Sequence, residues 1–443
     1  MATEAILQVK LLAPQDMANL CWSYAVLVAF NLQLLQTVSE EAVQKMQTFI
    51  PQDLSNLVWA LAKLDLRERT LLAAVASSAA LKMKAFLPQH LSNLAWAFAT
   101  LDAYDDALFH AISREAMMKL EDFTPQGLSN VAWGLSTVRA SDMGLFNAML
   151  KVAAQRGNLE PQCISNMFWA FAKCSMSSTS GKGAGAMNQL LRSTIEQSGP
   201  GLQAFKGQEL SNLVWAAATM GIQEGPVFRA VASEVAAKFE DVSLPELANL
   251  AWGFAVAGDK TDPGFLQVVA DETAARLHNF TPSSVPSAYL SEAATAINSI
   301  VWALDFAGLM DDDLLSLARQ SLLQLGCTLD SLKACPRVSV LHQSQPAFRT
   351  SSAEPQIVLQ LPDRLVIQKP CLWEGDDAVE ESHGLSLTSY MQAEAPGRLW
   401  PIFRDRGHQM GFLHRLDLPS SGLLLAAKTY SAFYALQLEL NGG

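Results

Sequence analysis

Apolar side chains recur with helical spacing along the first three quarters of the chain. In residues 88–100 the apolar and small positions fall on two sides of one helix. The two stripes consist of Leu91, Leu94, Ala95 and Phe98, and of Ser92, Trp96 and Ala99. A helix with two such stripes is expected to lie between neighbouring helices. The pattern therefore predicts the inner helix of a layered helical array.

The same segment recurs as PQDLSNLVWALAKL from residue 51, PQHLSNLAWAFATL from 88, PQGLSNVAWGLSTV from 125 and PQCISNMFWAFAKC from 161. Its tryptophan occurs eight times, at Trp22, Trp59, Trp96, Trp133, Trp169, Trp215, Trp252 and Trp302. The usual step of 37 residues has room for two helices and two turns. We therefore expect residues 1–325 to form about eight helix pairs, with inserted loops near 175–200 and 281–291.

Each first helix is expected to begin at a Pro that follows a capping residue, as at Thr124-Pro125. The residue after every Trp is Ser, Ala or Gly, which predicts a close approach of neighbouring repeats. The Trp itself is predicted to be buried and to pack, rather than to stack on a base.

Asn stands three residues before Trp in seven repeats, and Ser299 takes its place in the eighth. The seven are Asn19, Asn56, Asn93, Asn130, Asn166, Asn212 and Asn249. Because Asn is a poor helix former, its recurrence at one register needs a reason. A buried amide ladder between repeats is the favoured interpretation, and contact with RNA is the alternative.

The position three residues before this Asn varies from repeat to repeat. It holds Asp16, Asp53, His90, Gly127, Cys163, Glu209, Glu246 and Ala296. An acid in the first helical turn is favoured by the helix dipole, which is the structural interpretation. A varying position is also where a nucleotide code could reside. Asp53, His90, Glu209 and Glu246 are therefore candidate RNA-binding residues.

Charge favours a different partner. Residues 1–330 carry 32 acidic and 21 basic side chains, whereas phosphate neutralisation by Lys and Arg dominates most nucleic-acid affinity. An acidic array is therefore also expected to suit a protein partner. The six scattered cysteines show no metal-ligand spacing and are predicted to be reduced thiols that mostly pack in helices. The N-terminus shows neither a secretory signal nor a transit peptide, and residues 20–36 are too short and polar to predict a membrane span.

The pattern changes beyond the repeats. Residues 326–355 are predicted to be a linker and residues 356–443 a second domain, in which IVLQL, DRLVIQKP and FLHRLDL are expected strands. On a strand Arg415 and Asp417 would project from one face, where the guanidinium would hold the carboxylate ionised. Such an acid suits a nucleophile or general base, although a structural ion pair is the common reason for this spacing.

The repeat text PQxLSNLAWAxAxL resembles the helical-pair repeats of octotricopeptide and heptatricopeptide proteins over residues 1–325. The resemblance implies a mostly α fold, with a right-handed α-solenoid that binds RNA on its inner surface. It also implies a mitochondrial or chloroplast location, with the cytoplasm as the alternative.

HRLDLPSSGLLLAAK, from residue 414, resembles the signature of the RluA-type pseudouridine synthases, and DRLVIQKP and SLTSYM resemble two further family segments. The resemblance implies a partial α+β synthase domain, in which Asp417 attacks uridine with Arg415 as its partner. It implies no metal or organic cofactor. His414, Lys369 and Lys428 are tentative RNA contacts, although the two lysines could equally end their strands. The family continues with strands that carry an aromatic and a basic site residue, so we expect little catalysis from this chain alone.

These features predict an RNA-binding repeat protein, acting on organellar or ribosomal RNA, with a pseudouridine synthase module that converts uridine to pseudouridine. A non-catalytic organellar RNA-binding factor is one alternative. A protein-binding scaffold similar to armadillo or HEAT arrays is another, and neither alternative implies a membrane.

Overall fold

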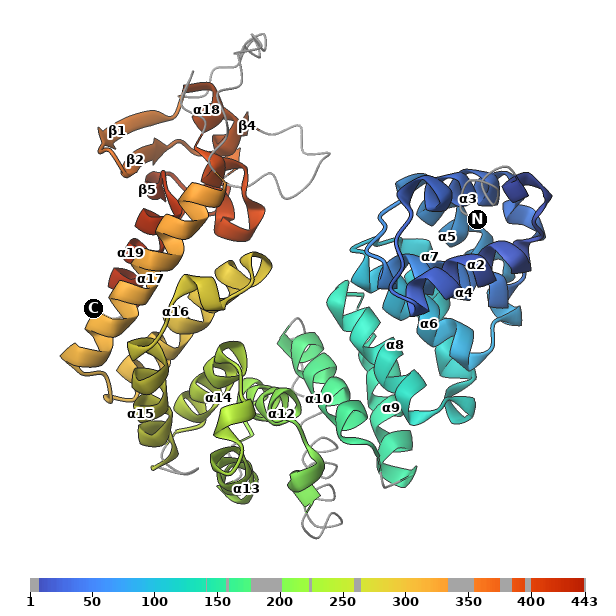
Figure 1. Ribbon diagram of the computed structural model, residues 1–443, viewed down its shortest axis with the longest axis horizontal. Coiled ribbons are helices and arrows are strands. Elements are labelled where there is room, and N and C mark those ends of the chain that lie inside the picture. Colours follow the sequence, from blue (N-terminus) through green and yellow to red (C-terminus); the bar gives the residue numbers. More distant parts are fainter. Residues whose placement is uncertain are drawn as a thin grey trace. The chain divides into compact units, whose positions relative to one another are not determined.

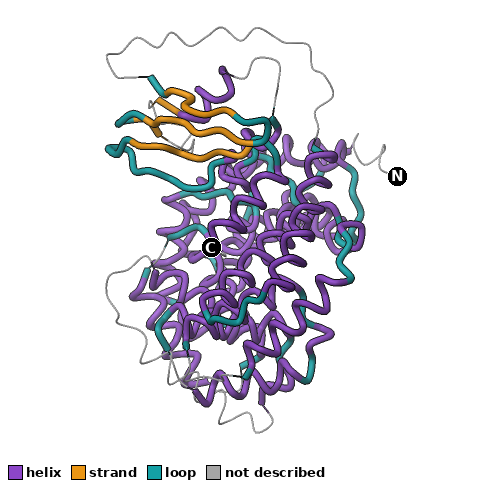
Figure 2. Tube along the Cα trace, turned by 90° about the vertical axis from the view of Figure 1, so that its left-hand side faces the viewer, coloured by secondary structure: helices purple, strands orange, loops and turns teal. Residues whose placement is uncertain are grey.

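The computed structural model describes residues 8–140, 142–156, 159–176, 201–222, 225–258, 264–333, 354–374, 385–394 and 400–441. The chain divides into two compact units, Met1–Val242 with Ala257–Asp262, and Ser243–Val256 with Pro263–Gly443. The fold is mostly helical (Figure 1). Strands are confined to a small region near the C-terminus (Figure 2).

Helix pairs build the first unit, as the repeat predicts. The first helices of the pairs are α2 (Pro14–Val26), α4 (Pro51–Lys63), α6 (Pro88–Thr100), α8 (Pro125–Thr137), α10 (Pro161–Met176) and α12 (Gly207–Thr219). The second helices are α3 (Leu32–Lys45), α5 (Arg69–Lys82), α7 (Asp106–Met118), α9 (Met143–Arg156) and α13 (Gly225–Ala236). Each first helix packs on the next first helix, and α3, α5, α7 and α9 pack in the same order. The expected insert near 175–200 lies mostly outside the described residues.

The helices α2, α4, α6, α8 and α10 begin at Pro as expected, whereas the residues before α2, α4 and α6 cap without a side-chain hydrogen bond. The Thr124 hydroxyl accepts a hydrogen bond of 3.1 Å from the Gly127 backbone N–H, ahead of Pro125 at the first helical position. A Cβ added to Gly134, which follows Trp133, would lie 2.7 Å from the Ala95 carbonyl oxygen of the neighbouring repeat. Only a very small residue therefore lets α6 and α8 approach so closely.

A basic side chain closes five helix pairs, a device that the sequence analysis missed. At the end of the second helix, this side chain donates to two carbonyls in the turn that precedes the first helix of the same pair. The five residues are Lys45, Lys82, Lys119, Arg156 and Lys238. In the third pair the Lys119 ammonium donates to Lys84 O at 3.0 Å and Phe86 O at 2.6 Å, and lies 2.8 Å from Glu115. Charge-assisted hydrogen bonds thus connect the end of the second helix to the start of the first helix in these five pairs.

The second unit continues with helix pairs and ends in an α/β segment. Its pairs are α14 (Leu244–Ala257) with α15 (Phe265–His278), and α16 (Leu290–Phe306) with α17 (Asp312–Leu332). The expected insert near 281–291 forms two short turns, Pro282–Ser284 and Ser287–Tyr289, before α16 begins.

The sheet consists of β1 (Gln356–Gln360), β2 (Arg364–Lys369) and β5 (Gly422–Ala427), antiparallel in the order β1-β2-β5. The remaining elements are the paired short strands β3 (Trp373–Glu374) and β4 (Leu385–Ser386), the helices α18 (Leu387–Glu394) and α19 (Tyr430–Asn441), and the 3-10 turns η9 (Pro401–Arg404) and η10 (Arg406–Gly411). The expected strands at IVLQL and DRLVIQKP are therefore present.

The predicted linker is wrong at its start, because α17 continues to Leu332 and packs on α19. A Cβ on Gly326 would lie 2.3 Å from Ser431 Cα, so the two helices cross with their backbones in contact there. The Asp330 carboxylate accepts from the Tyr430 N–H at 2.7 Å and from the Ser431 N–H at 3.2 Å, which caps the start of α19. Residues 334–353 of the expected linker lie outside the described residues.

A second carboxylate, Asp405, holds the same junction. Its Oδ2 accepts a 2.9 Å hydrogen bond from the Tyr430 hydroxyl, lies 3.0 Å from Nδ1 of His408, and forms an ion pair with Lys333 just beyond α17. Burial opposes ionisation, but interactions with His408, Lys333 and Tyr430 outweigh it and hold the pKa of Asp405 well below its usual range. The α/β segment is thus joined to the last helix pair by charged groups.

In the described part of the chain, no helix is long and apolar enough to span a bilayer. The apolar run at residues 20–36 is divided, because α2 ends at Val26 and α3 begins at Leu32. Among the described cysteines, Cys21, Cys163 and Cys174 are buried in helices, whereas Cys327 and Cys371 are exposed. The prediction of packing thiols therefore holds for the first three, and Cys335 lies outside the described residues.

The closing lysine gives a stability prediction. Lys119→Met keeps the aliphatic stem but removes three donors, so it leaves the Phe86 carbonyl and the buried Glu115 carboxylate without their partner. We expect the free energy of unfolding to fall by about 2 kcal/mol, as for a hydrogen bond to a charged group. Urea unfolding followed by circular dichroism measures it. Lys84→Met, at an exposed side chain with no polar contact to the described residues, is the control and should cost little. Equal loss in both variants would contradict the structural role of Lys119.

The Asp405 cluster gives a pH prediction. A carboxylate whose pKa is lowered by folding stabilises the fold above its unfolded pKa of about 4 and loses that contribution as pH falls. We expect the urea midpoint of the second unit to drop between about pH 5 and about pH 2, and to drop less in Asp405→Asn. Denaturation of both proteins across this range tests it. Parallel pH profiles would show that Asp405 does not carry the effect.

Candidate functional site

The tryptophans of the first unit form a row that is only partly buried. Trp59, Trp96, Trp133, Trp169 and Trp215 are half-buried, and Trp22 is 46% exposed. The predicted burial of these rings is therefore wrong in part. The reason is that the next residue, such as Ala97, and the apolar stripe that includes Phe98 fill the interface between the helices. The large indole lies at the rim of that interface and keeps part of its surface accessible.

Lysine ammonium groups lie over several of these rings. Lys63 Nζ is 5.6 Å from the centre of the Trp59 ring and 5.1 Å from the centre of the Trp96 ring, so it contacts tryptophans of two successive repeats. Lys173 Nζ lies 4.4 Å from the Trp169 ring, and the rings of Trp169 and Trp215 are 6.4 Å apart. Each lysine stands one helical turn after its Trp, so the sequence contained this signal. The first unit therefore presents a row of aromatic faces with cations among them, here called the tryptophan stripe.

The repeated Asn belongs to this stripe and not to a buried ladder. Asn19 is exposed and the other six are half-buried. One bond between repeats is present, from Asn212 Nδ2 to Ser165 Oγ at 3.3 Å. The buried polar position is the preceding serine, as at Ser92, whose hydroxyl donates to the Gln89 carbonyl. The expected amide ladder is therefore wrong, because the serine occupies the buried register and leaves the amide near solvent.

The varying position has a structural role in five repeats. Its side chain accepts a hydrogen bond from the backbone N–H three residues earlier, at distances of 2.7–3.3 Å. The five acceptors are Asp16, Asp53, His90, Glu209 and Glu246. Burial raises the pKa of Asp53, and burial together with Lys119 lowers the pKa of His90, which suits an accepting Nδ1. These side chains cap their helices, and a role in reading RNA stays a prediction.

The C-terminal motif lies on a loop. Residues 413–421 form bends and turns, and Phe412 alone bridges to β5, at Ala426. The predicted strand FLHRLDL is therefore wrong. The physical reason is the buried Lys369 ammonium, which binds the carbonyls of Asp417 at 3.0 Å, Leu418 at 3.3 Å and Ser420 at 2.6 Å. Carbonyls held around one cation are not available to a sheet ladder.

The loop exposes the residues singled out by the motif. His414, Arg415 and Asp417 are all exposed. Among the described residues, the Asp417 carboxylate has no hydrogen-bond or ion-pair partner. The predicted strand geometry that would place Arg415 and Asp417 on one face is absent, and the nucleophilic role of Asp417 stays a prediction.

The remaining candidates hold the loop and the strands in place. His414 Nε2 accepts from the Leu425 N–H at 3.3 Å, which anchors the loop to β5. Lys428 is buried, donates to the Leu361 carbonyl and lies 4.7 Å from the Trp400 ring. Lys369 and Lys428 therefore make structural contacts at the ends of β2 and β5. This agrees with the expected alternative in which the two lysines end their strands instead of contacting RNA. No group of His, Cys, Asp or Glu in the described ranges could hold a metal ion.

Comparison of the chain with models of known protein families and with curated proteins finds no match. The likeness of the repeats and of the HRLD motif to known families therefore remains a prediction from short segments. The arguments that follow rest on geometry and chemistry.

The exposed loop gives a prediction for Asp417. Because its carboxylate is exposed, Asp417→Ala should change the free energy of unfolding by less than about 0.5 kcal/mol. Asp330→Ala, at a carboxylate that caps α19, is the contrasting variant and should cost about 1 kcal/mol or more. Chemical denaturation of the three proteins makes the comparison. A large loss in Asp417→Ala would show that this residue supports the fold.

Proposed function

We propose that this chain is an RNA-binding helical-repeat protein, an α-solenoid that holds single-stranded RNA along its tryptophan stripe. One observation carries the proposal. The indole rings are left partly uncovered at one register, and the Lys63 and Lys173 ammonium groups lie over their faces. Rings needed only for packing would be buried, whereas the accessible part of each ring can contact a base.

The chemistry of the stripe suits an unpaired strand. Stacking of a base on an aromatic ring contributes about 1–3 kcal/mol and tolerates any base. The half-buried Asn amides lie one turn from each ring and offer donors and acceptors to base edges. Because the same Trp and Asn recur in each unit, the stripe carries little sequence information. The five lysines and arginines that close the helix pairs are already bound to carbonyls, so few phosphates are neutralised and the salt dependence should be shallow.

The proposal has a second part, for the C-terminal segment. The HRLD motif supports a pseudouridine synthase-like module, in which Asp417 would attack the ribosyl uracil and Arg415 would assist. Exposure of the Asp417 carboxylate supports access for an everted nucleotide. If the segment is inert, the protein would be a non-catalytic RNA-binding factor, for organellar transcripts by resemblance of the repeats.

A protein-binding scaffold is the second candidate function. It is favoured by the excess of 32 acids over 21 bases in residues 1–330, which would attract a basic partner. Capture of an Arg- and Lys-rich peptide, without capture of RNA at low salt, would favour this candidate.

Lys63→Gln tests the stripe, because it removes one charge at an exposed side chain that lies over two Trp rings. We expect about fivefold weaker binding of a fluorescently labelled single-stranded RNA 30-mer of mixed sequence, since a cation near a ring or phosphate contributes about 1 kcal/mol. Anisotropy titrations measure the affinity. Lys84→Gln removes the same charge from an exposed site off the stripe and is the matched control. Equal weakening in both variants would mean that the affinity for RNA depends only on the net charge of the protein.

Pseudouridine mapping tests the second part. Organellar and ribosomal RNA are incubated with wild-type protein or with Asp417→Ala, and modified positions are mapped by reverse transcription after carbodiimide treatment. Marks made by wild type and absent with Asp417→Ala are the expected result. RNA binding without marks would leave the RNA-binding part intact and remove the enzymatic part.

A further inference from the structure

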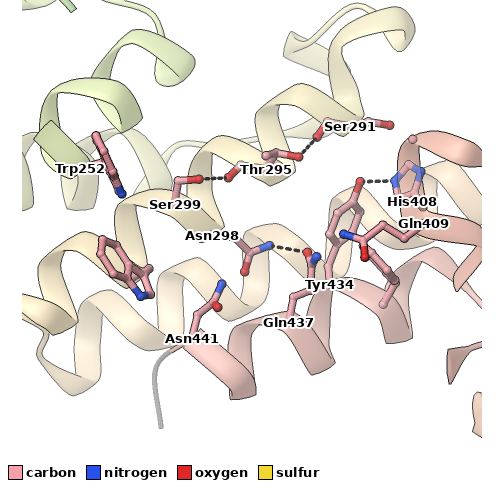
Figure 3. A pocket seen from close by; sticks show the side chains of 13 residues that line it. Trp252, Ser291, Thr295, Asn298, Ser299, His408, Gln409, Tyr434, Gln437 and Asn441 are labelled. Atoms are coloured by element: carbon pink, nitrogen blue, oxygen red, sulfur yellow. Dashed lines mark hydrogen bonds between the residues drawn. The ribbon is translucent and has the colours of Figure 1, made fainter. Parts of the chain in front are cut away.

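The second unit contains a pocket of about 340 Å3 that the motif residues do not line. Its walls come from the repeat helices α14 and α16 on one side, and from α19 and η10 on the other (Figure 3). This volume is at the lower end of the range for small-molecule sites, about 300–1,000 Å3. Asp417 lies outside it, so the pocket is separate from the proposed synthase residues.

The lining carries little charge. It contains no Asp, Glu, Lys or Arg, and its two titratable side chains, His408 and Tyr434, share a 2.7 Å hydrogen bond. Four amide side chains line the pocket, Asn298, Gln409, Gln437 and Asn441. Figure 3 shows Asn298 of α16 facing Gln437 and Asn441 of α19. Such walls suit a neutral molecule with several donors and acceptors.

One of these amides, that of Asn298, has an oxygen without a hydrogen-bond partner. Asn298 is 5% exposed, and its Nδ2 donates to Ala294 O at 3.3 Å and lies 3.5 Å from Gln437 Oε1. Because a backbone carbonyl only accepts, the atom facing Ala294 O is the amide nitrogen, which places Oδ1 on the other side. Oδ1 is buried and has no hydrogen-bond partner. Because Oδ1 has almost no accessible surface, a ligand in the pocket would meet the rest of this side chain, and Asn298 serves to position Gln437.

The sequence shows that this amide departs from the repeat. Five repeats read Ser-Asn ahead of Trp, with Ser in the buried register and Asn on the stripe, at 55–56, 92–93, 129–130, 165–166 and 211–212. The last repeat reverses the order to Asn298-Ser299. The reversal moves the amide from the stripe into the interior, against α19. The amide therefore lies in the wall that α16 shares with α19, where Asn298 contacts Gln437 and lines the pocket.

Aromatic faces complete the pocket. Trp252 of α14 and Trp302 of α16, the repeat tryptophans of the second unit, both line it and are half-buried, and Trp302 stacks on Phe306 with ring centres 5.3 Å apart. A planar ligand can therefore stack on an indole while its edge meets the amides. We propose that this pocket binds one unstacked nucleobase, with the side-chain amides of Gln409, Gln437 and Asn441 meeting the edge of the base. The ribose and any phosphate would extend to solvent.

This inference goes beyond the proposed function and does not depend on it. The tryptophan stripe lies in the first unit, whereas the pocket is formed by the second unit alone. The base can come from a free nucleoside or from a strand of RNA, because the amides and rings contact only the base. The two sources differ in their effect on affinity, since a strand adds backbone contacts that a nucleoside lacks.

The test restores the repeat order with the double variant Asn298→Ser plus Ser299→Asn, which keeps the composition unchanged. Uridine, cytidine, adenosine and guanosine are titrated into the full chain and followed by saturation-transfer NMR and calorimetry, with ribose as the probe that lacks a base. We expect wild type to bind at least one nucleoside and not ribose. The swapped variant should bind it about tenfold more weakly, because it removes the amide that holds Gln437 at the pocket wall. Asn441→Ala, near the end of α19, should also weaken nucleoside binding. It is the second test variant and replaces the swapped variant if that protein does not fold.

Three outcomes decide the proposal. Wild-type protein that binds no nucleoside at millimolar concentration overturns it, as does unchanged affinity in both folded variants. Binding that is lost in the variants supports it, and competition by a short RNA oligomer at much lower concentration than the nucleoside assigns the source to RNA. Lys63→Gln should leave nucleoside affinity unchanged, so failure of RNA binding along the stripe is distinguishable from failure of the pocket.

Discussion

One recurring set of charge-assisted hydrogen bonds organises the helical part of this protein. In five helix pairs a basic side chain at the end of the second helix reaches the carbonyls of the turn that leads into the first helix of the same pair, as Lys119 does at Phe86. These carbonyls lie at the end of a short 3-10 turn, where helical partners are missing. The ammonium satisfies them and fixes the angle between the paired helices. The first helices can then stack through small residues such as Gly134, and their tryptophans are carried to the rim at a constant register.

The helical architecture was predictable because it repeats. A pattern rewritten eight times shows which positions are apolar, small or capped, and the starts of the helices at Pro follow from local chemistry. The degree of burial was not predictable in the same way. Whether Trp96 or Ser92 occupies the interior depends on how far one helix is rotated against the next, and helical periodicity places both on one stripe. The closing lysines recur at the repeat length too, but their carbonyl partners have no sequence signature.

The C-terminal segment shows the other limit of sequence reasoning. The alternation of β2 was visible, because this strand buries one face. FLHRLDL has the same alternation and forms a loop, since the Lys369 ammonium gathers its carbonyls from a position 48 residues earlier in the chain. The end of the repeats was misplaced for a similar reason. Asp330 and Lys333 look like linker residues by composition, and only the positions of Tyr430 and Asp405 explain them.

The crossing at Gly326 has a consequence for how the second unit comes apart. Because no side chain separates α17 from α19 there, the last repeat and the C-terminal strands share one interface and should be lost in a single cooperative step. Helix α19 also forms a wall of the pocket and packs on β5. A larger side chain at residue 326 would push α19 away from α17 and thus open the pocket. A ligand bound in the pocket would stabilise α19, and the sheet that packs on α19 would then resist proteolysis although the ligand does not contact it.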